Sequence, residues 1–173
     1  ADRPMLRIRT AAPSDIPRIN RIERLSGQRF RTIEMPEIAD DEPTSPELLE
    51  QRIQSGQLIL AEKDGSRVAF AMFRFLDNSL YIEQIDVIPE LQGQRIGVAL
   101  IEYMERQAGE KGCTDLLLST FREIPWNAPY YRRLGFADIA GTDLPPALQN
   151  IRTRHIAAGL DESRRCFMFK SIR

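Results

Sequence analysis

Three β-rich runs in quick succession constrain the fold of this chain most strongly. The segment QLILAEKDGSRVAFAMFRFLDNSLYIEQIDVIP, residues 57–89, is rich in β-branched and aromatic residues and is broken by Asp64-Gly65 and by Asp77-Asn78-Ser79. Both breaks have the composition of tight hairpin turns. The pattern therefore predicts an antiparallel meander of three strands.

The segment before this meander predicts one strand followed by helices. Residues 5–10 have the composition of a strand, and helical spacing of isoleucines starts near residue 15, with Ser14 or Asp15 as the cap. Ser45 followed by Pro46 predicts the start of another helix, after an acidic loop rich in proline. We expect that loop to cover a site.

After the meander, helical and strand patterns alternate. The expected elements are a helix at 92–110, a strand at 114–120, a helix at 126–134, a strand at 136–140, a helical run at 145–160 closed by Gly159, and a strand at 164–172. The predicted fold is one α/β (α+β) domain over residues 1–173, with a mixed, mostly antiparallel central sheet of six to seven strands flanked by helices.

Charge and hydropathy exclude several classes of protein. The formal net charge is -1, so no overall basic field would attract a nucleic acid. No apolar run approaches the ~20 residues that cross a bilayer, and the first ten residues lack the apolar core of a signal peptide. We expect a cytoplasmic protein that binds neither nucleic acid nor membrane.

Cysteine and histidine are too scarce to suggest a metal site. Cys113 and Cys166 lie far apart in the sequence, without CxxC spacing, and His155 is the single histidine. We expect no metal and no disulfide, and we interpret both cysteines as small apolar side chains.

The sequence changes character abruptly within VIPELQGQRIGVALI, residues 87–101. An apolar strand pattern ends at Pro89, and a polar turn with Gly93 and Gly97 leads directly into a helical pattern. The first N–H groups of a helix have no acceptor within that helix and attract anions, and glycines let an anion come close to the main chain. An ordinary strand-to-helix turn would have the same composition, and the stretch matches neither GxGxxG nor GxxxxGK[ST].

This stretch resembles the phosphate-binding motif of the GNAT superfamily of acyl-CoA-dependent N-acetyltransferases. In that motif, Q/R-x-x-G-x-G/A follows a strand that ends in V-x-P. Here Val87-Ile88-Pro89 precede Gln92-Gly93-Gln94-Arg95-Ile96-Gly97. Arg95 occupies the position of the usual first glycine, and its guanidinium could meet a phosphate.

A second stretch, WNAPYYRRLGF at residues 126–136, resembles the later cofactor-side motif of the same superfamily. In that motif an Asn precedes an aromatic-Tyr pair, and a Tyr lies four residues before Gly-Phe, as Tyr131 does before Gly135. Asn127 lies closer to this Tyr than the Asn of many relatives does. The tail AGLDESRRCFMF is similar to that of a bacterial branch of the superfamily.

The resemblance implies acetyl-CoA as the co-substrate. Main-chain amides of the phosphate motif would bind the diphosphate, main-chain groups of the preceding strand would bind the pantetheine arm, and Asn127 would add a contact. The implied cofactor-binding residues are Ile85, Val87, Gln92, Gly93, Gln94, Arg95, Ile96, Gly97 and Asn127.

Acyl transfer to an amine requires a base, because a free alkyl amine has a pKa near 10.4. Glu83 is the first candidate, since odd residues of the strand share one face and the resemblance places Ile85 and Val87 beside the cofactor. Asp86 would point the other way and is the alternative. Glu83 could equally be a solvated carboxylate, or one paired with an arginine across the sheet, with no part in catalysis.

The departing thiolate requires a proton donor, and Tyr131 suits this role by its chemistry and its position in the motif. An aromatic packing role remains open for Tyr131 and is favoured for Tyr130. His155 could border the acceptor, although a place on a helix surface fits it better. Arg132 and Arg133 are interpreted as a solvated basic turn.

The predicted function is transfer of an acetyl group from acetyl-CoA to a primary amine, of a small molecule or a peptide, by direct attack. One alternative is a sensor of the same fold that binds acyl-CoA without turnover; another is an RNA-binding sheet suggested by VAFAMFRF. Residues 26–50 and 141–160 would select the acceptor, and the cluster Asp40, Asp41 and Glu42 favours a cationic amine. Dimers are frequent in the family, so a homodimer is compatible with the resemblance.

Overall fold

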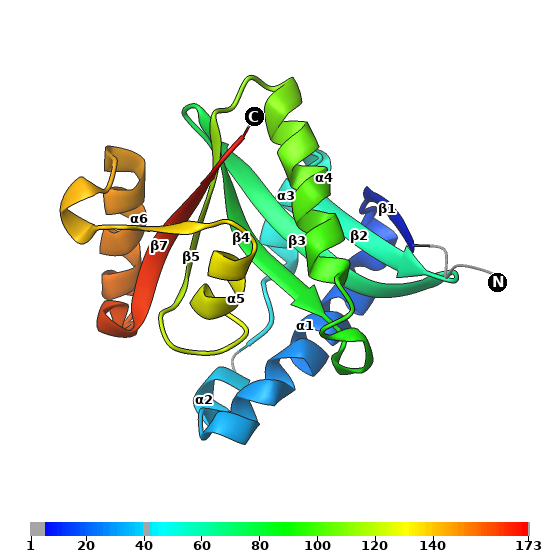
Figure 1. Cartoon of the computed structure of the whole chain (residues 1–173). Coiled ribbons are helices and arrows are strands. Elements are labelled where there is room, and N and C mark those ends of the chain that lie inside the picture. The colour runs from blue at the N-terminus through cyan, green and yellow to red at the C-terminus, as the bar shows by residue number, and fades with distance from the viewer. Residues whose placement is uncertain (1–5, 40–41, 173) are drawn as a thin grey trace. The chain divides into compact units, whose positions relative to one another are not determined.

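A computed structural model describes residues 6–39 and 42–172 of the 173-residue chain. Its strands form one seven-stranded sheet in the order β1-β2-β3-β4-β5-β7-β6 (Figure 1). The strands are β1 (Leu6–Thr10), β2 (Leu58–Lys63), β3 (Ser66–Leu76), β4 (Ser79–Val87), β5 (Asp115–Phe121), β6 (Ala137–Ile139) and β7 (Arg165–Ser171). β4 and β5 pair in parallel, whereas β1 with β2, β2 with β3, β5 with β7, and β6 with β7 pair antiparallel. The predicted fold class is confirmed.

Six α-helices accompany these strands in the described part of the chain. They are α1 (Ile16–Gly27), α2 (Pro36–Ala39), α3 (Pro46–Gln54), α4 (Ile96–Glu110), α5 (Ala128–Arg133) and α6 (Pro146–Ala157). Short 3-10 helices cover Pro13–Asp15, Gln28–Ile33, Pro89–Leu91, Gly141–Asp143 and Glu162–Arg164.

The contacts of the chain divide it into two compact units. The first unit comprises Ala1–Arg74 and Gln84–Tyr103, and the second comprises Phe75–Glu83 and Met104–Arg173. The expectation of a single domain over residues 1–173 is not decided by this division and stays a prediction.

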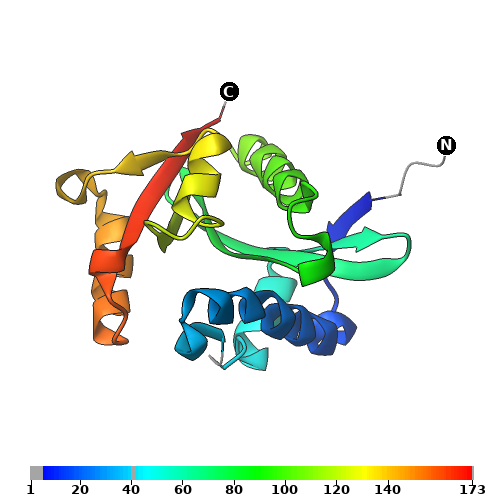
Figure 2. The same ribbon diagram turned by 60° about the horizontal axis from the view of Figure 1, so that its bottom comes forward.

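In the first unit, α1 and α3 cover a core formed with β2 and β3. Its fully buried side chains include Ile19, Leu49, Leu58 and Phe70. Figure 2 shows α1 on one face of these strands and the beginning of α4 on the other. Since both faces are covered, residues 58–61 of β2 and 68–73 of β3 form buried apolar runs without polar alternation.

Asp15 connects β1, the start of α1 and β3 in this unit. Its carboxylate, which is almost fully buried, accepts two hydrogen bonds from Arg9 at 2.8 and 3.0 Å and one from Arg67 at 3.0 Å. The Arg9 guanidinium holds the pKa of this carboxyl well below its usual range. Asp15 precedes α1 as expected, but its side chain accepts from the N–H of Ala12 rather than capping the helix.

In the second unit, β7 lies between β5 and β6 rather than at an edge of the sheet. Tyr81, Leu117 and Phe167 of its strands pack against Leu148 and Ile151 of α6. The last strand of the chain is therefore an interior strand that holds β6 in the sheet.

One expected element boundary lies at the limit of the described residues, one differs from the structure, and one expected helix cap is present. Met5, expected in the first strand, lies outside the described residues, and β1 is described from Leu6. The helix expected from residue 92 begins at Ile96, because Pro89–Leu91 form a 3-10 helix and residues 92–95 form a turn. Ser45 caps α3 as expected, and its side chain accepts a hydrogen bond from the N–H of Leu48 at 3.3 Å.

Candidate active site

The connection between β4 and α4 is a tight turn with two residues in the left-handed region. Gly93 has a φ of 83° and Arg95 a φ of 66°. A Cβ added to Gly93 would meet no atom within 4 Å, so the main chain there faces open space. Arg95 adopts the left-handed conformation with a side chain, which costs an L-residue about 1 kcal/mol.

Main-chain N–H groups gather at this turn. Gln92 N–H donates to the carbonyl of Pro89 and Gln94 N–H to the carbonyl of Leu91, each at 3.3 Å. The structure gives no main-chain acceptor for five further N–H groups among the described residues; these belong to Gly93, Arg95, Ile96, Gly97 and Val98. The turn therefore presents donors at the amino end of a fifteen-residue helix, where an anion is stabilised.

The two glutamine side chains brace this turn. Gln92 Nε2 donates to the carbonyl of Val87 at 3.0 Å, which ties the turn back to the end of β4. Gln94 Oε1 accepts from Lys63 Nζ at 3.2 Å, and its Nε2 donates to the carbonyl of Glu90 at 3.4 Å. The sequence predicts cofactor binding for both residues, and the observed contacts of their side chains are intramolecular.

The end of β4 has one main-chain edge that does not face β3. The N–H of Ile88 donates to the carbonyl of Val68 in β3 at 3.0 Å. Since main-chain groups of successive residues in a strand point to opposite edges, those of Val87 and Ile85 point away from β3. The β4–β5 ladder covers Ser79–Ile82 and leaves Ile85 and Val87 outside it.

Gln84 and Asp86 occupy the face of β4 toward α1. Asp86 Oδ1 accepts from the hydroxyl of Ser26 at 3.2 Å, and Oδ2 accepts from Gln84 Nε2 at 2.6 Å. Burial raises the pKa of Asp86 to about 7, and the nearby charge of Glu23 acts in the same direction. The expectation that Asp86 points away from the face of Ile85 and Val87 is consistent with these contacts.

Glu83, the first candidate for the base, is half-buried. Its role as the base stays a prediction. The sequence ranked Asp86 second because strand alternation points it away from the face of Ile85 and Val87, and its burial is not visible in the local pattern. Its raised pKa depends on α1, a helix about sixty residues earlier in the chain.

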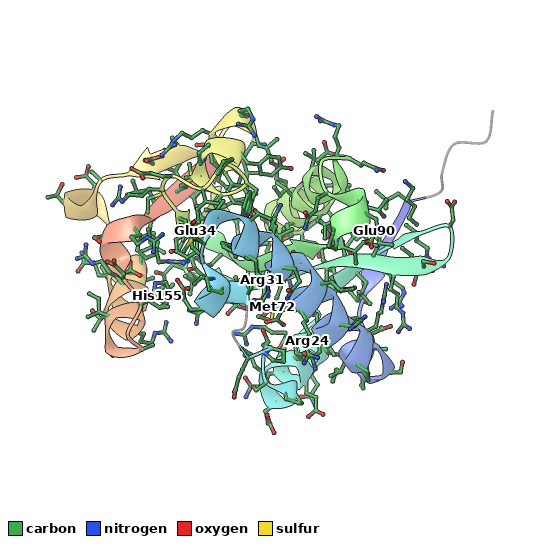
Figure 3. The ribbon with its side chains drawn as sticks, turned by 90° about the horizontal axis from the view of Figure 1, so that it is seen from below. Arg24, Arg31, Glu34, Met72, Glu90 and His155 are labelled. Carbon is green, nitrogen blue, oxygen red and sulfur yellow. The ribbon has the colours of Figure 1, made fainter. Side chains whose placement is uncertain are left out.

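A cavity of about 180 Å³ opens beside Asp86 within the first unit. Its charged lining residues are Glu23, Arg24, Glu42 and Asp86, and its apolar ones include Phe30, Ile38, Ala39 and Pro43. Figure 3 shows the face on which α1 lies and labels Arg24. Asp40 and Asp41, which the sequence grouped with Glu42, lie outside the described residues.

In the second unit, Asn127 precedes α5 and Tyr131 lies within it. The N–H of Tyr131 donates to the carbonyl of Asn127 at 3.0 Å. The ring of Tyr131 meets those of Tyr130 and Phe136 edge to face, with centroids 5.5 and 5.6 Å away. Asn127 Oδ1 is buried without a hydrogen-bond partner, which is costly unless a ligand or water donates to it.

Two other polar residues of this unit, His155 and Arg132, have acidic partners. His155 Nδ1 lies 2.7 Å from Glu162 Oε1, and its ring stacks on Phe167. Arg132 pairs with Asp138 at the surface. The expected surface position of Arg132 is confirmed, while His155 is half-buried and has a glutamate partner that sequence reasoning missed.

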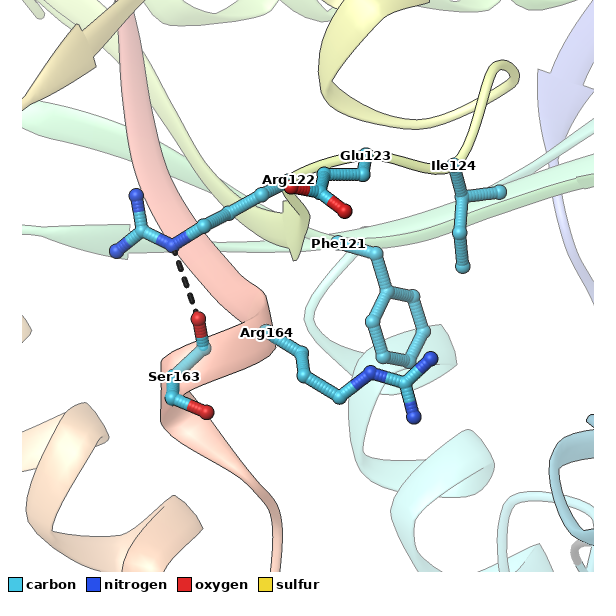
Figure 4. Close-up of a pocket in the computed structure, with 6 residues that line it drawn as sticks. All are labelled: Phe121, Arg122, Glu123, Ile124, Ser163 and Arg164. Atoms are coloured by element: carbon cyan, nitrogen blue, oxygen red, sulfur yellow. Dashed lines mark hydrogen bonds between the residues drawn. The ribbon is translucent and has the colours of Figure 1, made fainter.

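A second cavity, of about 270 Å³, lies at the end of β5 (Figure 4). Its lining residues are Phe121, Arg122, Glu123, Ile124, Ser163 and Arg164. Arg122 Nε donates to the carbonyl of Ser163 at 3.2 Å, which ties the segment after β5 to the segment before β7.

Within residues 6–39 and 42–172, no group of three or more His, Cys, Asp or Glu side chains could hold a metal ion. Cys113 and Cys166 are free thiols, and burial raises the pKa of both. Among the described helices, none has the length and apolar character needed to span a bilayer.

Comparison with solved structures shows the same fold in several enzymes. N-acetylglutamate synthase from Neisseria gonorrhoeae, solved with coenzyme A and N-acetyl-glutamate, aligns with a TM-score of 0.76 and 19% identity over 100% of this chain. The chain spans 36% of the length of that protein. PaiA N-acetyltransferase from Thermoplasma acidophilum, solved with coenzyme A, aligns with a TM-score of 0.65 and 17% identity over 96% of this chain and 99% of its own.

The ribosomal-protein-S18-alanine N-acetyltransferase from Escherichia coli aligns with a TM-score of 0.67 and 18% identity, over 97% of this chain and 94% of its own. At these identities the likeness establishes the fold. The profile of the Acetyltransferase (GNAT) family matches residues 25–136, which is more than half of the 173 residues and includes both the β4–α4 turn and α5. The chain therefore belongs to the GNAT acetyltransferase family.

Proposed function

We propose that this protein transfers an acetyl group from acetyl-CoA to a primary amine. The observation that carries the proposal is the set of main-chain donors at the β4–α4 turn, in a chain of the GNAT family. The turn has the chemistry to bind a diphosphate, because several N–H groups and a helix amino end act together. Relatives solved with coenzyme A support the same ligand.

The residues present fit coenzyme A at three places. The main chain at Gly93 faces open space, so a diphosphate could reach the donors there. Ile85 and Val87 offer main-chain groups to which an extended pantetheine arm could bind like an added strand. The buried Oδ1 of Asn127 is an acceptor without a partner, as expected of a residue that receives a ligand N–H.

Acetyl-CoA would supply a thioester whose carbonyl carbon is attacked by the amine nitrogen. The N–H of Val87 would donate to the thioester oxygen, and one donor of this kind lowers the barrier by roughly 3 kcal/mol. Tyr131 would donate its hydroxyl proton to the departing sulfur, because a phenol is protonated at neutral pH. Glu83 would take a proton from the amine, directly or through a water molecule.

Tyr131→Phe tests this assignment. Release of free thiol from acetyl-CoA in the presence of an amine panel should fall by about 10² to 10⁴-fold, since a general acid contributes that much. Affinity for coenzyme A, measured by calorimetry, should change less than about twofold because the ring is retained. Tyr130→Phe is the matched control and should retain wild-type turnover.

The sensor alternative makes the opposite prediction for the same measurements. A sensor would bind coenzyme A, but no amine or peptide amino terminus would accelerate thiol release, and Tyr131→Phe and Glu83→Gln would change nothing. Absence of coenzyme A binding would overturn both readings. The cytoplasmic location, the homodimer and the absence of a metal and of nucleic-acid or membrane partners stay predictions.

A further inference from the structure

The proposed function gives the cavity beside Asp86 no role. It is formed within one unit, by α1, the residues that follow α1, and the end of β4. Asp86 lies between Ile85 and Val87, the residues whose main-chain edge suits the acyl-carrying arm. A group held in this cavity would therefore adjoin the segment of β4 that is proposed to bind the co-substrate.

A chain of hydrogen bonds holds the Asp86 carboxylate in place. Gln84 Nε2 donates to Asp86, and Gln84 Oε1 lies 3.2 Å from the hydroxyl of Thr44. The N–H of Thr44 donates to both carboxylate oxygens of Glu23, at 3.0 and 3.1 Å. Two acidic side chains are thus positioned by polar partners, Asp86 by Ser26 and Gln84, and Glu23 by Thr44.

Four charged side chains lie around Asp86. α1 contributes Glu23 and Arg24, the following 3-10 helix contributes Arg29, and Glu42 also lines the cavity. The lining itself carries three carboxylates and one guanidinium, so it favours a cation and disfavours a carboxylate. Its size also limits the ligand, since a cavity of about 150 Å³ holds a molecule such as benzene.

We propose that this cavity holds the amine acceptor, that Asp86 is the base that deprotonates it, and that the preferred acceptor is a small apolar amine without a carboxylate beside its nitrogen. This inference rests on the proposed function and replaces Glu83 in the role of base. Asp86 differs from an ordinary surface carboxylate in that burial raises its pKa to about 7. A base with such a pKa can accept a proton at neutral pH and release it afterwards.

The ammonium nitrogen loses one proton to an Asp86 carboxylate oxygen, and its freed lone pair forms the C–N bond. The C–S bond breaks, and its electron pair remains on sulfur. Sulfur gains a proton as the nitrogen loses its second one, and Asp86 releases the first proton to solvent, so each turnover yields an amide, a thiol and one proton.

Phenethylamine and phenylalanine form a matched pair of probes, because they differ only in the α-carboxylate. Calorimetry at pH 8 on the coenzyme A-bound protein should show at least tenfold tighter binding of phenethylamine. Asp86→Asn should weaken the binding of phenethylamine at least tenfold and reduce the preference for phenethylamine over phenylalanine. Glu50→Gln, which removes an exposed charge on α3, should leave both affinities unchanged.

The pH dependence separates a base from a residue that only shapes the cavity. A folded-state pKa above the usual value means that Asp86 becomes a carboxylate only as the pH rises through about 7. The ratio kcat/KM should therefore rise through about pH 7 in the wild type, and Asp86→Asn should abolish this rise. Glu23→Gln should move it to lower pH, because the charge of Glu23 helps to raise the pKa of Asp86.

A carboxyl-carbon NMR titration of Asp86 provides a readout independent of turnover and should show the same pKa and the same shift in Glu23→Gln. The inference is overturned if phenylalanine binds as tightly as phenethylamine, or if Asp86→Asn retains the wild-type pH profile while thiol release continues. In that case the proposed acetyltransferase function still stands. Loss of coenzyme A binding in the wild type would instead remove the function itself.

Discussion

At the scale of single residues, Arg95 shows how a departure from a family motif can be accommodated. The position requires a φ of 66°, which glycine adopts readily and which other residues adopt at a cost. The arginine retains its main-chain N–H, so the donor set of the turn is complete. The conformational cost is small compared with the stability of a domain of this size.

A pair of substitutions measures this cost. Arg95→Gly should be more stable than Arg95→Ala by about 1 kcal/mol, because alanine keeps a Cβ in the left-handed region and glycine does not. Both variants remove the guanidinium, so charge cancels in the comparison. The measurement is the midpoint of urea unfolding, and equal midpoints would show that the turn relaxes to a different conformation.

At the scale of elements, β4 presents a main-chain edge on one side and two polar side chains on another. The main chain of Ile85 and Val87 faces the edge away from β3, while the side chains of Gln84 and Asp86 point toward α1. Alternation along the strand makes this division possible, because neighbouring residues point in opposite directions. The Gln92 side chain then joins the end of the strand to the donors of the turn.

Gln92→Ala tests whether this brace matters for ligand binding. Loss of the hydrogen bond to the carbonyl of Val87 should free the turn and lower coenzyme A affinity about fivefold, which corresponds to about 1 kcal/mol. Gln54→Ala, at the exposed end of α3, is the control and should bind as the wild type does. Unchanged affinity in Gln92→Ala would mean that the turn is held without this bond.

At the scale of the whole molecule, three elements contribute residues to both compact units. The boundaries between the units fall inside β3, between Arg74 and Phe75, inside β4, and inside α4, between Tyr103 and Met104. The hydrogen bonds within α4 cross the boundary between Tyr103 and Met104, so neither unit can unfold alone without breaking some of them. We therefore expect both units to unfold together.

Differential scanning calorimetry should show one transition for the full chain. The expected enthalpy is about 120 kcal/mol near 60 °C for a chain of this length, with equal calorimetric and van't Hoff values. Such a result would support the single domain that the sequence predicts over residues 1–173. Two separate heat-absorption peaks would instead mark two domains.

Most of the fold followed from the sequence because its signals are local. Turn pairs such as Asp64-Gly65 delimit the meander, Ser45-Pro46 marks the start of α3, and the glycines after β4 mark the turn whose main chain carries the donors. Tertiary structure alone decided the interior position of β7, the pairing of His155 with Glu162, and the environment of Asp86. Strand order and the burial of a carboxylate depend on contacts between segments far apart in the chain, and no local pattern of residues encodes them.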